Sequence, residues 1–93
     1  MLKSIIISGV RYDIIEIETV DNDPTVMGLC VYADSVIYIK KALSKDRKNQ
    51  TLIHEVMHAM FYEAGFDEQD EDEVNRLGKV LFQVLKENDL EVS

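Results

Sequence analysis

Residues 51–65 read TLIHEVMHAMFYEAG, and this stretch carries the clearest helical pattern in the chain. Apolar residues recur in it at intervals of three and four, the spacing of one face of an amphipathic helix. They are Leu52, Ile53, Val56, Met57, Met60, Phe61 and Ala64. Ser44 is the expected N-cap, and Gly65 is the expected stop after the last turn. The pattern therefore predicts one helix between these two residues.

A second helix is predicted from about residue 70 to residue 88, because apolar residues again follow helical spacing. Its expected buried stripe is Val74, Leu77, Leu81, Val84 and Leu85. Gly78 lies beside this stripe and would let the two helices approach closely. The two helices are therefore expected to pack on each other.

The first 42 residues carry β-branched and aromatic runs separated by turn residues, which favours strands and hairpins. The expected strands are residues 5–7, 10–14, 15–20, 29–32 and 36–40. We therefore predict an α+β fold in which a small antiparallel sheet is followed by two packed helices, a minimal zincin-like core. We expect a single domain over residues 1–93, with a β-rich half (1–42) and a helical half (44–92).

Composition narrows the classes of function. The chain has 93 residues, 46 % of them hydrophobic, and a formal net charge of −8. This charge argues against binding to nucleic acid or to an anionic membrane. No apolar run is long enough for a signal peptide or a membrane span, so we expect a cytoplasmic protein. The single cysteine, Cys30, allows no internal disulfide, and a metal ion is a candidate for stabilising so small a chain.

The pentapeptide His54-Glu55-Val56-Met57-His58 has the pattern H-E-x-x-H inside the first predicted helix. Four residues turn a helix by about 400°, so His54 and His58 share a face and can reach one tetrahedral metal ion. Glu55 then lies beside the metal, where a general base would take a proton from metal-activated water. Zinc is the expected ion, because it accepts imidazole and carboxylate ligands. The alternative is a chance match on an amphipathic helix.

A third protein ligand is expected from the acidic run at the start of the second helix. Glu71 is favoured, because Asn75 follows one turn later, placed to support a ligand. With Gly78 and Phe82 these two residues form one ridge of the helix. Glu73 is the second choice, since its spacing from Asp70 suits a capping box. Asp70 itself, Cys30 or no third ligand stay open as alternatives.

His54–His58 followed by Glu71-Asp72-Glu73-Val74-Asn75 resembles the zinc metallopeptidases of the gluzincin type. The resemblance is to the ImmA/IrrE family and its small phage-encoded relatives, loosely over residues 28–88 and well over 50–88. It implies that His54, His58 and Glu71 bind zinc and that Glu55 is the catalytic base. It also implies that strand 36–40 borders the cleft and binds an extended peptide by strand addition. Val74 departs from the usual Ala.

The resulting hypothesis is a zinc-dependent metalloprotease, phage or prophage encoded, that acts on a peptide or protein substrate. The first alternative is a catalytically silent, zinc-stabilised binding module on the same fold, and the second is an acidic DNA mimic. No tyrosine is assigned as oxyanion donor, with Tyr62 and the strand tyrosines open, and the oligomeric state is open too. A basic cluster over residues 40–48 is compatible with docking of an acidic partner, but such clusters are more often a solvated loop and helix start.

Overall fold

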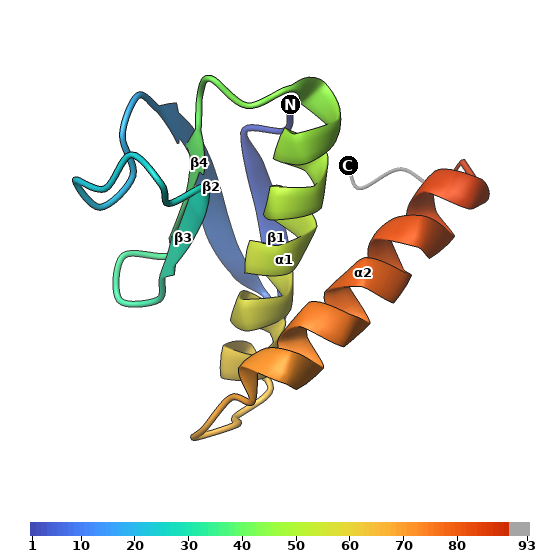
Figure 1. Ribbon diagram of the computed structural model, residues 1–93. Helices are drawn as coiled ribbons and strands as arrows, with labels where there is room; N and C mark the ends of the chain where they lie inside the picture. The colour runs from blue at the N-terminus through green and yellow to red at the C-terminus, as the bar shows by residue number, and fades with distance from the viewer. Residues whose placement is uncertain (90–93) are drawn as a thin grey trace.

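The computed structural model describes residues 1–89, and its elements follow the order expected from the sequence, strands first and helices second (Figure 1). They are β1 (Ser4–Ile7), β2 (Val10–Ile17), β3 (Gly28–Val31), β4 (Val36–Lys40), α1 (Lys45–Glu63) and α2 (Glu71–Glu87). The predicted α+β class is confirmed. The segments 10–14 and 15–20 were predicted as separate strands, but β2 joins them into one strand that ends at Ile17.

The four strands form one mixed sheet in the order β1-β2-β4-β3. Within the hairpins, β1 pairs with β2 and β3 with β4 in antiparallel fashion, as predicted. The sheet is nevertheless not antiparallel throughout, because β2 and β4 pair in parallel, with Ile14 opposite Ile37. Turn residues fix the direction of pairing only inside a hairpin, whereas pairing between hairpins depends on which strands must bury their apolar faces together.

The hydrophobic core lies between one face of the sheet and α1. Its buried members come from both layers: Ile7, Tyr12, Ile14, Ile37, Ile39, Leu52, Val56 and Ala59. Helix α2 packs against α1 and contacts none of the described strands, so it forms an outer layer (Figure 1). For this reason α2 buries only Val74 and Gly78, while Leu77 and Val84 of its predicted stripe are exposed.

Side chains at the helix ends agree with the prediction. The Ser44 hydroxyl accepts a hydrogen bond from the Arg47 amide, which caps α1. Gly65 has φ 95°, the left-handed conformation that ends a helix. The Asp70 carboxylate accepts from the amides of Asp72 and Glu73 and starts α2. Neither of the two described helices is long and apolar enough to cross a membrane.

Candidate metal centre

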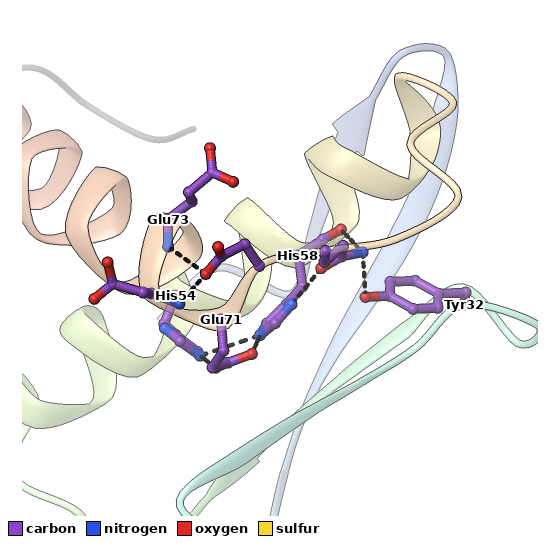
Figure 2. A network of polar contacts seen from close by, with 8 residues as sticks. Tyr32, His54, His58, Glu71 and Glu73 are labelled. Atoms are coloured by element: carbon purple, nitrogen blue, oxygen red, sulfur yellow. Dashed lines mark hydrogen bonds and ion pairs between the residues drawn. The ribbon is translucent and has the colours of Figure 1, made fainter.

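His54 and His58 lie on the same face of α1, one turn apart, and their Nε2 atoms are 3.2 Å from each other (Figure 2). Glu71, the first residue of α2, completes the group. Its Oε1 lies 3.3 Å from His54 Nε2, and its Oε2 lies 3.5 Å from His58 Nε2. The structure therefore brings the three ligands that were favoured from the sequence to one point between the helices.

The distance between the two imidazole nitrogens matches the size of a tetrahedral site. Bonds of about 2.0–2.1 Å at tetrahedral angles place neighbouring ligand atoms about 3.3 Å apart. The two Nε2 atoms are 3.2 Å apart, each lies within 3.5 Å of a different oxygen of Glu71, and one ligand atom from each residue lies within 4.8 Å of the other two. Two imidazole nitrogens and a carboxylate are also a donor set that suits a divalent transition metal. These residues therefore fit a metal ion in number, chemistry and spacing.

The other candidate ligands lie apart from this group. Within residues 1–89, the described cluster of possible ligands contains Glu71 and does not include Glu73, Asp70 or Cys30. The Glu73 side chain points away from the two imidazoles (Figure 2), and Asp70 caps the helix. Burial raises the pKa of the Cys30 thiol to about 12, which disfavours the thiolate that a metal requires.

The ridge of α2 that carries Glu71 faces α1, as predicted. A Cβ placed on Gly78 would lie 3.8 Å from His54 Cα, so the two helices are close at the histidine. The predicted support from Asn75 is absent, because no hydrogen bond joins its side chain to Glu71 in the described part of the chain. Asn75 instead lines a cleft beside the metal centre.

Gln69 provides the support that the sequence analysis missed. Its Oε1 lies 2.6 Å from His58 Nδ1, and its amide nitrogen donates to the Tyr32 hydroxyl at 2.9 Å and to the His58 carbonyl at 3.2 Å. An amide oxygen can only accept, so His58 carries its proton on Nδ1 and turns the lone pair of Nε2 to the centre. The only available signal was a neutral amide within an acidic run just before the helix.

Tyr32 and Tyr12 lie in different surroundings. Tyr32, just after β3, stacks on Tyr62 with ring centroids 4.3 Å apart, and its hydroxyl accepts from Gln69. Tyr12 lies in the core and donates to Glu63 at 2.6 Å, and burial raises its pKa. Tyr32 is thus the tyrosine connected to the metal centre.

Glu55 is 7 % exposed and lies between α1 and the start of β3. Burial raises the pKa of its carboxyl to about 7; His58 opposes this rise and Glu71 adds to it. Burial and the neighbouring His58 both lower the pKa of His54, which keeps that imidazole neutral. A carboxyl with a pKa near neutrality is suited to accept and return a proton.

A cleft of about 780 Å³ opens beside His54 and Glu55, and Met27 and Gly28 at the start of β3 form part of its wall. The resemblance predicted that strand 36–40 would bind substrate by strand addition. That is wrong for this sheet, because β4 lies between β2 and β3 and both of its edges are paired. Among the described strands, β3 is the last of the sheet on this side, so one of its edges is unpaired.

Comparisons of the chain with protein-family models, curated proteins and solved structures found no match. Membership of the ImmA/IrrE family therefore stays a prediction, and the proposal below is based on the geometry of the site.

Proposed function

We propose that this protein is a zinc-dependent metallopeptidase in which His54, His58 and Glu71 hold the ion and Glu55 is the general base. The observation that carries the proposal is the convergence of two imidazole nitrogens, 3.2 Å apart, on the Glu71 carboxylate, whose two oxygens lie 3.3 and 3.5 Å from them, beside the buried carboxyl of Glu55. The cleft and the free edge of β3 support it, since an extended peptide needs both room and backbone partners.

When bound, zinc supplies Lewis acidity, which acidifies water and polarises a peptide carbonyl. Residues of the chain would transfer the proton, orient the ligands and align the substrate. Glu55 accepts the proton of the attacking water and returns it to the leaving amine. Gln69 fixes the orientation of His58 through Nδ1. The edge of β3 aligns the peptide through backbone hydrogen bonds, which position the scissile bond without regard to its side chains.

The test begins with metal content. Protein purified without a histidine tag should contain about one zinc per chain by mass spectrometry, and His54→Ala should lose it. A peptide library should then be cleaved by the zinc-loaded protein but not by Glu55→Gln, which keeps all three ligands. A chain that binds no zinc, or a Glu55→Gln variant with full activity, contradicts the proposal.

A second candidate is a zinc-stabilised binding module without turnover. The observation in its favour is that α2 contacts only α1 among the described elements, so an ion held by His54, His58 and Glu71 would fasten the outer helix to the rest. Zinc would then raise the melting temperature equally in wild-type protein and Glu55→Gln, and neither would cleave peptides. Zinc-dependent cleavage by wild-type protein alone excludes this candidate.

A further inference from the structure

The cleft beside the metal centre runs between residues 47–55 of α1 and residues 75–86 of α2. Each helix contributes residues at helical spacing, so a single stripe of each faces the cleft. The stripe on α1 includes Arg47, Gln50 and His54, and the stripe on α2 includes Lys79, Phe82 and Lys86. The cleft therefore continues from the metal centre along both helices, beyond the reacting groups.

The charge of this cleft is opposite to that of the protein. Arg47, Lys79 and Lys86 line it, and among residues 1–89 the only acid in its wall is Glu55, which lies at the metal end. The whole chain has a net charge of −8. Such a local reversal of sign attracts an anionic group to the cleft while the rest of the surface repels it.

These three cations have no carboxylate partner within 4.0 Å in the part of the chain that the structure describes. Of the cations outside the cleft, Arg11, Lys41, Lys48 and Arg76 form ion pairs, whereas Lys3, Lys40 and Lys45 form none among the described residues. Lys86 lies over the Phe82 ring, 5.7 Å from its centroid, which holds its ammonium group at the cleft wall. The cations of the cleft are therefore available to a ligand.

The distance along α1 sets where the ligand's charge would lie. Arg47 precedes His54 by seven residues, which is about 10 Å along a helix and the same face. An extended peptide covers about 3.3 Å per residue. A carboxylate that reaches Arg47 while the scissile bond lies at the metal centre is thus about three residues from that bond.

We propose that this cleft selects peptides that carry an acidic side chain about three residues from the scissile bond. The proposal rests on the metallopeptidase function proposed above and names its substrate class. A peptide is favoured over a nucleic acid as the occupant because a chain of charge −8 repels a polyanion at longer range, whereas a single carboxylate reaches only the cleft.

The test measures binding separately from cleavage. The probes are two pools of capped decapeptides that are randomised except at alternate positions, which carry Asp in one pool and the neutral isostere Asn in the other. Binding to wild-type protein and to Glu55→Gln is measured by calorimetry with added zinc. Each exposed ion pair contributes a few-fold at most, so three together should favour the Asp pool by about tenfold at low salt. This preference should shrink as salt is added.

Two triple variants with the same net charge separate the cleft from the overall charge. R47Q/K79Q/K86Q should lose the preference for the Asp pool, whereas K3Q/K41Q/K45Q, which changes residues outside the cleft wall, should keep it. Equal binding of the two pools by wild-type protein overturns the proposal. So does an equal loss in both triple variants, or binding of a short DNA duplex as tight as that of the Asp pool.

Cleavage of the same pools, read by mass spectrometry, distinguishes the two proposals. The Asp pool should be cleaved more readily than the Asn pool. Binding preference without cleavage refutes the peptidase proposal and leaves the cleft assignment standing. Cleavage without any Asp preference refutes the cleft assignment and leaves the peptidase proposal standing.

Discussion

Replacement of Gln69 by alanine should weaken zinc binding without touching a ligand. Gln69 makes three hydrogen bonds, one to His58 Nδ1 at 2.6 Å and two through its amide nitrogen. Without the acceptor, His58 loses the partner that fixes its tautomer and its ring orientation. Loss of such a supporting group lowers metal affinity by about 10–100-fold. This corresponds to about 1.4–2.7 kcal/mol.

The structure places Gln69→Ala towards the upper end of this range. The bond to His58 Nδ1 is short, and Gln69 is half-buried, so water replaces it poorly. In the wild-type protein the three hydrogen bonds of Gln69 also hold the segment between the helices. At about 1 kcal/mol each, their removal should lower the stability of zinc-free protein by about 3 kcal/mol at most.

The assay is competition for zinc against a chromophoric chelator, with circular dichroism to verify the fold. Gln69→Glu should bind zinc within a few-fold of wild type, because a carboxylate also accepts from Nδ1. Glu68→Ala, the exposed neighbour, should have no effect. A folded Gln69→Ala variant with wild-type affinity would show that the orientation of His58 does not depend on this residue.

Three further outcomes are expected. Glu71→Gln should lower zinc affinity by more than about 100-fold, because the loss of a ligand costs more than the loss of a supporting group. Glu73→Gln should leave the affinity unchanged in the same competition assay. Equal losses in the two variants would contradict the assignment of Glu71 as the third ligand. In zinc-free protein the pKa of Glu55 is raised from 4.5 to about 7, so the folded state favours the protonated form. The stability from this shift is complete below pH 4.5 and lost as the pH rises through about 7. Relative to Glu55→Gln, the wild-type protein should lose about 3 kcal/mol of its free energy of unfolding over this pH range. Urea denaturation at several pH values measures this loss. Parallel pH profiles of the two proteins would refute the prediction. Gly78→Ala should raise the free energy of unfolding by about 0.5–1 kcal/mol, because alanine is favoured over glycine inside a helix. Its Cβ would lie at an ordinary contact distance of 3.5 Å from Met57 Cγ. A fall in the urea midpoint would show that the packing of α2 on α1 requires glycine at this position.

The helices were predictable because their signals are local. The hydroxyl of Ser44, the left-handed Gly65 and the carboxylate of Asp70 act within three or four residues of the chain, and each occupies the position expected from the sequence. The buried face of α2 was predicted less well. Periodicity identifies an apolar stripe but not the size of the surface that covers it, and α1 alone is too narrow to cover Leu77.

In the sheet, too, local pairing was predictable and pairing between distant strands was not. Hairpin pairing follows from the turn residues, but the parallel pairing of β2 with β4 joins strands that are separated by a whole hairpin. Local sequence signals therefore could not locate the free edge of the sheet at β3 rather than at β4. The free edge follows from the spatial order of the strands, β1-β2-β4-β3, which the turn residues do not specify.

By itself, the sequence determined that His54 and His58 share one face, with Glu55 beside them, because four residues make about one helical turn. It could rank Glu71 above Glu73 but could not decide between them. The tertiary structure places Glu71 rather than Glu73 beside the two histidines, and it adds Gln69 and the basic wall of the cleft. These features depend on where α2 crosses α1, and that crossing is fixed by packing between residues far apart in the chain.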